Sequence, residues 1–302
     1  MLNDFMIMTS LGSLMYLIFQ TLTVKSFFKL ALTSHELNSS YRLESTDDLL
    51  YKSNWPFLKV RPPHRIQSPV NIITSNATQV MLPPFQHVGY WGDDEILVNV
   101  TNNGHTVYVS LTNDEQNIPI GVTGGPLFDD LYMFDQLHLH WGEHDEGSEH
   151  KFNGQSYAME IHLVHHKIDY GTFNEALKYY DGLCVVSYFG EISEEDDEEM
   201  TNFINDLQSL IEPGSSVIRL IGEEFFWLKK TADQIDYFAY PGSLTTEPYA
   251  ESVTWIAFTI PFKISRKQLA KFRNLRSHDS GVLINKNDRE LQEFNNRPIV
   301  YV

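Results

Sequence analysis

Two short runs of residues with a period of two constrain the fold of this chain most strongly. The run LHLHW begins at residue 137, and the run MEIHL begins at residue 159. Successive side chains of a β-strand point to opposite faces of a sheet, so each run predicts a strand with one polar and one apolar face. If the two strands are neighbours, His138, His140 and His162 converge on one face of that sheet.

A buried cluster of three histidines points to a metal ion. Polar side chains are costly to bury unless something binds them, whereas a single strand histidine is commonly a satisfied core or surface residue. The His-x-His pair alone is therefore a weak indication, and the Glu-x-His run that ends at His162 makes it specific. Three neutral nitrogen ligands that leave a fourth position open are typical of catalytic zinc.

Longer motifs extend this pattern. The chain reads His-Leu-His-Trp-Gly from His138, Gly-Ser-Glu-His from Gly147 and Glu-Ile-His-Leu-Val-His from Glu160. These motifs resemble those of the α-type carbonic anhydrases over roughly residues 54–298, so residues 54–302 are interpreted as one catalytic domain. The resemblance implies a mixed, β-dominated (α+β) fold, with a central, largely antiparallel twisted sheet and short peripheral helices.

The resemblance also implies zinc-dependent, reversible hydration of carbon dioxide to bicarbonate and a proton. Family members hold Zn²⁺ with three histidines, here His138, His140 and His162, and a zinc-bound hydroxide attacks the substrate. Uncharged imidazole ligands suit this chemistry because they leave the charge of the dication largely undiminished. Carbon dioxide, water and bicarbonate are the expected small-molecule partners, and sulfonamide-type compounds are the expected inhibitors. The alternative is a non-catalytic relative that acts as a binding module, but such relatives typically lose a ligand histidine.

The family's supporting residues have counterparts in this chain. Gln136 and Glu160 each lie two residues before a ligand histidine, on the strand face where the histidine's second ring nitrogen needs an acceptor. In the run Tyr-Pro-Gly-Ser-Leu-Thr-Thr, Thr245 matches the threonine that accepts a hydrogen bond from the hydroxide and donates one to a buried glutamate, here Glu149. Thr246 is expected to border the bicarbonate position.

A proton-transfer residue and a substrate wall follow from the same resemblance. The run Asn-Asn-Gly-His that ends at His105 matches the loop whose histidine exports the proton in fast members. An imidazole suits this role because its pKa lies near neutrality. Glu247 and Tyr108 differ from the residues usual at their positions, so the pocket is expected to differ in shape. Carbon dioxide is apolar, and the residues that match its apolar wall are Val164, Val185, Leu244, Val253 and Trp255.

Further strands and two helices are predicted from local patterns. Alternating apolar runs bounded by turn residues predict strands over residues 96–100, 106–111, 133–140, 158–164, 183–189 and 253–260. One helix is expected over residues 200–211, with Phe203, Leu207, Leu210 and Ile211 on one face. A second is expected over residues 265–275, capped by Ser265. The Ser68–Pro69 bond is expected to be cis, because the surrounding Gln-Ser-Pro-Val-Asn-Ile run resembles a family signature with that feature.

The N-terminal part is expected to lie outside the catalytic domain. Residues 1–24 are mostly apolar and are interpreted as a signal peptide or a signal-anchor helix that would hold the chain at a membrane, with residues 25–53 as a connector. Glycosylation sequons at Asn38, Asn76 and Asn99 favour a glycoprotein of the secretory pathway. A secreted or membrane-associated extracellular location is therefore expected, with a cytoplasmic location as the alternative.

Charge and cysteine content restrict the partners further. The formal net charge of −18 argues against binding to nucleic acid, which requires a basic face. Cys184 is the single cysteine, so no disulfide can form within the chain. Its apolar neighbours predict a buried, inert thiol.

Overall fold

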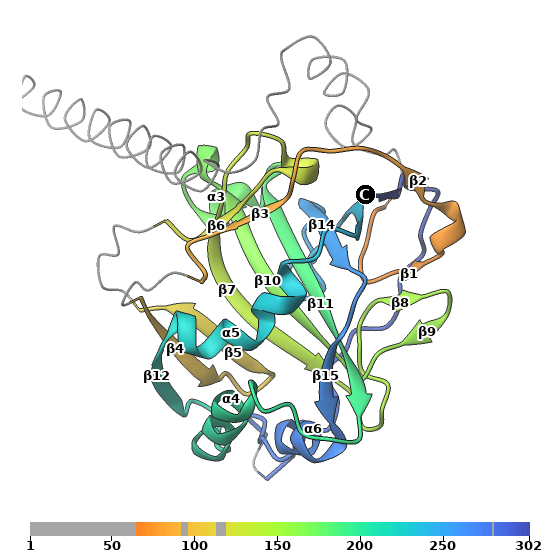
Figure 1. Cartoon of the computed structure of the whole chain (residues 1–302). Coiled ribbons are helices and arrows are strands. Elements are labelled where there is room, and N and C mark those ends of the chain that lie inside the picture. Colours follow the sequence, from red (N-terminus) through yellow and green to blue (C-terminus); the bar gives the residue numbers. More distant parts are fainter. Residues whose placement is uncertain (1–64, 92–95, 113–118, 280) are drawn as a thin grey trace, which may run out of the picture. The chain divides into compact units, whose positions relative to one another are not determined.

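The computed structural model describes residues 65–91, 96–112, 119–279 and 281–302 (Figure 1). The apolar segment 1–24, the connector 25–53 and the sequon at Asn38 lie outside these residues, so the interpretations of them remain predictions. Within the described ranges, no helix is both long enough and apolar enough to cross a membrane.

Strands make up most of the described chain. They are β1 (Asn71–Ile72), β2 (Thr78–Gln79), β3 (Gln86–Val88), β4 (Leu97–Asn102), β5 (Val107–Leu111), β6 (Gly121–Thr123), β7 (Tyr132–Trp141), β8 (Lys151–Phe152), β9 (Gln155–Ser156), β10 (Met159–Lys167), β11 (Leu183–Ser193), β12 (Ser216–Leu220), β13 (Tyr237–Gly242), β14 (Val253–Phe258), β15 (Phe262–Ser265) and β16 (Val300–Tyr301). Each of the predicted strand runs forms a strand, with ends shifted by a few residues.

One large sheet organises these strands. Its 13 strands follow the order β12-β4-β5-β7-β10-β11-β14-β13-β16-β2, with β3, β6 and β15 paired beside this path. Most neighbours are antiparallel; among the described residues, the parallel pairs of this sheet are β11 with β14, β11 with β15, and β16 with β2. The long strands β7, β10 and β11 lie side by side in its middle (Figure 1). The predicted fold class, a largely antiparallel central sheet, is confirmed.

The helices are short and lie around the sheet (Figure 1): α3 (Phe173–Ala176), α4 (Thr201–Asp206), α5 (Ile221–Ala232) and α6 (Arg266–Phe272). α6 begins at the predicted cap, where Ser265 Oγ accepts the backbone N–H of Gln268 at 3.0 Å and Gln268 Oε1 accepts that of Ser265 at 3.2 Å. These reciprocal bonds form a capping box, which satisfies two backbone donors at the helix start.

The helix predicted over residues 200–211 is shorter than expected. α4 ends at Asp206 and continues as a 3₁₀ turn over Leu207–Ser209, so Ile211 lies beyond the last turn and is 37% exposed. Its prediction as part of the buried face is therefore wrong, whereas Phe203, Leu207 and Leu210 are buried. α5 is an element that the sequence analysis did not predict.

The apolar faces of β7 and β10 supply much of the core. Leu137, Leu139 and Trp141 of β7 are each at most 1% exposed, as the alternating pattern predicted. Cys184 on β11 is buried, and burial raises the pKa of its thiol. The Ser68–Pro69 bond is cis, as predicted, and Glu247–Pro248 is cis as well.

The pairing of β7 with β10 contains one irregularity. His138 lies opposite His162, and Gln136 lies opposite Val164. The next pair joins Phe134 to His165, so the intervening residue of β7, Asp135, has no partner in β10. An extra residue of this kind is a β-bulge, which redirects side chains and often occurs next to active sites.

Candidate metal centre and its cavity

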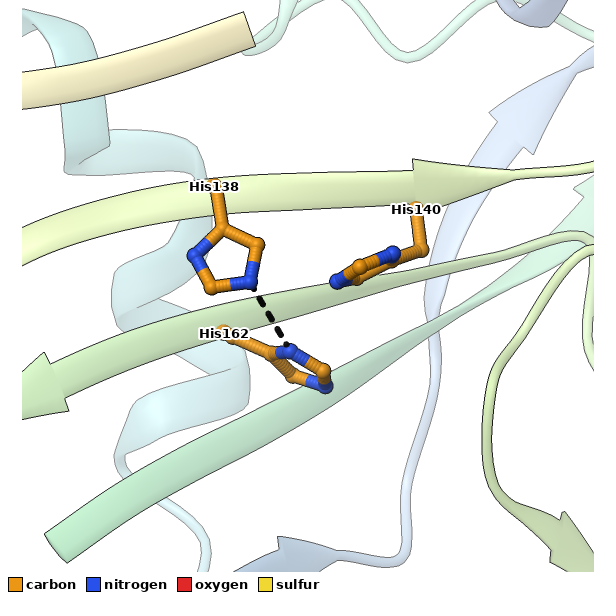
Figure 2. Close-up of side chains that lie close together, drawn as sticks. All are labelled: His138, His140 and His162. Carbon is orange, nitrogen blue, oxygen red and sulfur yellow. Dashed lines mark hydrogen bonds between the residues drawn. The ribbon is translucent and has the colours of Figure 1, made fainter. Parts of the chain in front are cut away.

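Three imidazole rings from two adjacent strands meet on the polar face of the sheet. Figure 2 shows His138 and His140 on β7 facing His162 on β10. The ring centroids lie 4.9 Å apart for His138 and His140, 5.1 Å for His138 and His162, and 4.7 Å for His140 and His162. All three side chains are buried. The structure therefore brings together the histidines that the alternating pattern placed on one face.

The outer ring nitrogen of each histidine donates a hydrogen bond to a protein oxygen. His138 Nδ1 donates to Gln136 Oε1 at 2.8 Å, and His162 Nε2 donates to Glu160 Oε1 at 2.8 Å. His140 Nδ1 donates to the backbone carbonyl of Asn287 at 3.0 Å. Each of these oxygens can only accept, so the outer nitrogen carries the proton and the inner nitrogen of each neutral ring presents a lone pair.

The inner nitrogens are left without a donor. His138 Nε2 and His162 Nδ1 lie 3.3 Å apart, the contact that is dashed in Figure 2, and in these tautomers both are acceptors. His140 Nε2 is buried and has no hydrogen-bond partner among the described residues. Burial lowers the pKa of His138 and His162, so both favour the uncharged form. Converging lone pairs are costly to bury unless a cation accepts them, and a metal ion fits this set of donors.

Glu160 is held as a buried carboxylate by two histidines. Its Oε1 accepts Nδ1–H of His150 at 2.7 Å as well as the bond from His162, and its Oε2 accepts the backbone N–H of His150 at 2.8 Å. Burial by itself raises the pKa of Glu160, but His150 and His162 outweigh it and lower that pKa well below the usual range. The chain of bonds continues from Nε2 of His150 to Tyr240 and from there to Ser68 at 2.9 Å.

Glu149 lies beside the centre, but its predicted bond to Thr245 is not formed. Glu149 Oε1 accepts the backbone N–H of Arg289 at 2.8 Å. Oε2 has no hydrogen-bond partner among the described residues and lies 3.9 Å from His162 Nδ1. Arg289 fixes one oxygen and the other lies on the side of the histidines, so the pairing with Thr245 stays a prediction.

A cavity of about 350 Å³ opens next to His138 and His162. The predicted wall residues Val164, Val185, Leu244 and Trp255 line it, together with Thr245 and Thr246. Val253 is buried and is not among the residues that line this cavity, so its role as a wall residue stays a prediction, whereas Trp255, two residues along the same face of β14, lines the cavity. The other lining residues are Tyr108, Asp135, Gln136, Phe173, Glu247 and Pro248.

Asp135 is a cavity residue that the sequence analysis missed. The bulge in β7 brings Asp135 and its neighbour Gln136 to the same cavity, although adjacent strand residues ordinarily face apart. Both carboxylate oxygens of Asp135 accept Nδ1–H of His166, at 2.8 and 2.9 Å. Burial raises the pKa of Asp135. Neither the bulge nor this pair has a signal in the residue pattern.

His105 lies outside the cavity wall. It is exposed on the turn between β4 and β5 and does not line the cavity. Its backbone carbonyl accepts Nδ2–H of Asn287 at 3.1 Å, and the carbonyl of Asn287 is the acceptor of His140 Nδ1. Asn287 therefore links the turn of His105 to the histidine centre, a connection that the sequence analysis did not find.

Comparisons with known proteins agree with this arrangement. The family model described as eukaryotic-type carbonic anhydrase matches residues 51–302. Carbonic anhydrase 7 of Mus musculus is 39% identical over 74% of this chain and 82% of its own length. Carbonic anhydrase 7 of Homo sapiens is 40% identical over 69% of this chain and 76% of its own length. Carbonic anhydrase 4 of Rattus norvegicus is 35% identical over 77% of this chain and 74% of its own length.

Proposed function

The chain belongs to the eukaryotic-type carbonic anhydrases, enzymes that hydrate carbon dioxide, and we propose that its three-histidine centre performs this reaction with Zn²⁺. One observation carries the proposal: three buried imidazoles, each protonated on its outer nitrogen, direct their lone pairs at one another. His138 Nε2, His140 Nε2 and His162 Nδ1 would hold the ion. When bound, Zn²⁺ makes a water ligand acidic enough to act as a nucleophile near neutral pH, as is established for this class of enzyme.

The outer acceptors keep the ligand atoms in place. Gln136, the carbonyl of Asn287 and Glu160 each hold one ring in the tautomer that binds a cation. Glu160 is itself fixed by His150, so the ring of His162 is positioned by a chain of hydrogen bonds and not by packing alone. Because all three ligands are uncharged, they neutralise little of the charge of a bound dication.

The cavity provides the substrate position. Val164, Val185, Leu244 and Trp255 would give carbon dioxide an apolar surface beside His138 and His162. An apolar wall excludes ordered water from the position where the neutral substrate binds. Thr245 is proposed to orient the attacking oxygen, which requires its hydroxyl to donate a hydrogen bond to Oε2 of Glu149, the oxygen that has no partner among the described residues. Thr246 borders the site where bicarbonate would form.

Proton export is assigned to His105. Each turnover releases a proton that must leave the cavity, and an exposed imidazole with a pKa near neutrality can accept it and pass it to buffer. His105 has the exposure that this role requires. We expect the transfer to run through water, because the His105 side chain does not line the cavity.

A stopped-flow assay tests the proposed reaction. We expect carbon dioxide hydration above the buffer rate, lost with a zinc chelator and restored by added Zn²⁺. A simple aromatic sulfonamide should bind the zinc-loaded chain and not the chelated one. If hydration never exceeds the buffer rate although the chain carries Zn²⁺, the proposed activity is wrong and the non-catalytic binding module remains.

The compartment is a separate proposal. We propose that the chain enters the secretory pathway through residues 1–24, with membrane anchoring by that segment and a cytoplasmic location as the alternatives. Asn76 is exposed, and Asn99 is half-buried within β4. Sequencing the mature N-terminus and testing Asn76 for a glycan distinguishes these locations: an intact, unmodified chain contradicts secretion.

A further inference from the structure

A second histidine lies against the turn that carries His105. His105 and His278 face each other edge to face, with ring centroids 5.5 Å apart and an angle of 71° between the rings. Both side chains are exposed. The two residues are far apart in the sequence, so the fold, and not the local chain, creates this contact.

Gly104 makes room for the second ring. Its φ of +80° is a conformation that favours glycine, and a Cβ placed there would overlap Cδ2 of His278. The imidazole of His278 therefore occupies the space that any other residue at position 104 would fill.

A hydrogen bond from the buried side chain of Asn102 joins the segments that carry the two rings. The side-chain amide of Asn102, which is fully buried, donates to the carbonyls of Leu210 at 3.0 Å, Ile211 at 3.1 Å and Arg276 at 3.0 Å. Arg276 also forms a β-bridge with Leu283, which closes the loop that carries His278. The buried side chain of Asn102 thus links the segments of two rings that are themselves exposed.

We propose that His278 is the second imidazole of a two-histidine proton relay, accepting protons from His105 and releasing them to buffer. This inference rests on the proposed function. His105, protonated by way of cavity water, gives one N–H proton to the unprotonated ring nitrogen of His278, directly or through one water. His105 is then neutral again, and the imidazolium of His278 loses its proton to a buffer base. Charge and protons balance with no other reactant.

The charged neighbours of the pair are largely neutralised. On the loop of His278, Arg276 is paired with Glu212 at 3.0 Å, and Asp279 follows His278 directly. On the segment that bonds the turn of His105, Lys286 is paired with Asp288 at 3.3 Å.

The kinetic test uses the full, zinc-loaded chain in a weakly buffered solution. His278→Ala and His278→Phe should each lower kcat by about threefold or more, while kcat/KM, which reports the carbon dioxide step, stays unchanged. Added imidazole should restore kcat. In a His105→Ala background, His278→Ala should cause no further loss. His144→Ala, which removes another exposed histidine, is the matched control and should change neither constant.

Phenylalanine separates a relay from a packing role. His278→Phe keeps a ring over Gly104 but carries no proton, so wild-type kcat in this variant overturns the proposal. Unchanged kcat in both His278 variants overturns it as well. If the unmodified, zinc-loaded chain does not hydrate carbon dioxide above the buffer rate, the proposed function fails. That outcome differs from a failure of the relay, in which the unmodified chain is active and the His278 variants keep its kcat.

NMR gives a readout independent of turnover. The ring resonances of His105 should differ between the wild-type chain and His278→Ala, because the two rings lie edge to face with their centroids 5.5 Å apart. Identical His105 resonances in the two chains would contradict the contact on which the relay rests.

Discussion

The buried histidine centre and the exposed histidine pair use the same side chain in opposite ways. At the centre, the outer nitrogen of each ring is fixed by an acceptor, and the rings are at most 8% exposed. At the pair, His105 and His278 are exposed, and among the described residues no hydrogen bond holds either ring. The contrast shows that a metal ligand needs a fixed lone pair, whereas a proton carrier needs access to solvent and freedom to reorient.

Removal of a ligand histidine from the buried centre should have the largest effect on metal binding and activity. His138→Ala removes one of three lone pairs, and we expect both stoichiometric metal binding and hydration to be lost, with the rate falling about 10³-fold or more. Metal analysis and stopped-flow hydration check this. His144→Ala is the control, and a His138→Ala chain that keeps its metal and its activity would refute the assignment.

Removal of an acceptor should weaken the centre without dismantling it. Glu160→Gln replaces a carboxylate that accepts bonds from His150 and His162, so we expect metal affinity to fall about 10- to 100-fold while the ligands stay in place. Competition with a chromogenic chelator measures the change. Unaltered affinity would show that packing, and not the hydrogen bond, positions His162.

Two histidines away from the centre, the buried His165 and the half-buried His87, predict sensitivity to acid. Burial lowers the pKa of His87 and of His165 to about 3, so the native state stays unprotonated while the unfolded chain binds protons below about 6.5. The free energy of unfolding therefore falls as pH decreases from about 6.5 towards 3. Between pH 6.5 and 5 each histidine contributes a loss of about 2 kcal/mol.

Urea unfolding at several pH values checks this slope. His87→Gln should be less stable at pH 7, because Tyr188 loses its partner, but should lose less stability between pH 7 and 5 than the wild-type chain. An equal slope in both chains would show that His87 is not the acid-sensitive group.

A substitution at Gly104 should have the smallest effect of these changes. It should disturb the contact of His105 with His278 and leave the metal centre intact. Gly104→Ala adds a Cβ at a positive φ and in the space of the His278 ring, so we expect a loss of about 1–2 kcal/mol in the free energy of unfolding. Metal content should stay at the wild-type level. Thermal unfolding and metal analysis measure both, and a fall in metal content would show that the link through Asn287 transmits the change from the turn to the histidine centre.

The sequence predicted the features that depend on side-chain alternation or on matched motifs. A period of two in β7 and β10 placed His138, His140 and His162 on one face, and the structure brings them together. The resemblance indicated Gln136 and Glu160, and both accept hydrogen bonds from the rings.

Features that depend on the backbone or on tertiary contacts were not predictable in the same way. Asn287 holds His140 through its backbone carbonyl, which every residue type possesses, so its identity gives no signal. The bulge at Asp135 is a shift in the pairing register of β7 with β10, and no residue type in the sequence indicates it. α5 has apolar residues at a helical spacing, Ile221, Phe225 and Leu228, but Phe226 and Trp227 between them obscure that spacing.

The most direct measurement is the coordination of a metal ion in the full chain. We expect about one Zn²⁺ per chain, and an X-ray absorption spectrum with three imidazole nitrogens at about 2.0–2.1 Å. His140→Ala should lose the ion, because the inner nitrogen of His140 is a buried atom with no hydrogen-bond partner among the described residues and is one of the three proposed ligands. A chain that binds no zinc after incubation with it, or a spectrum with sulfur ligands or without imidazole, would contradict the account.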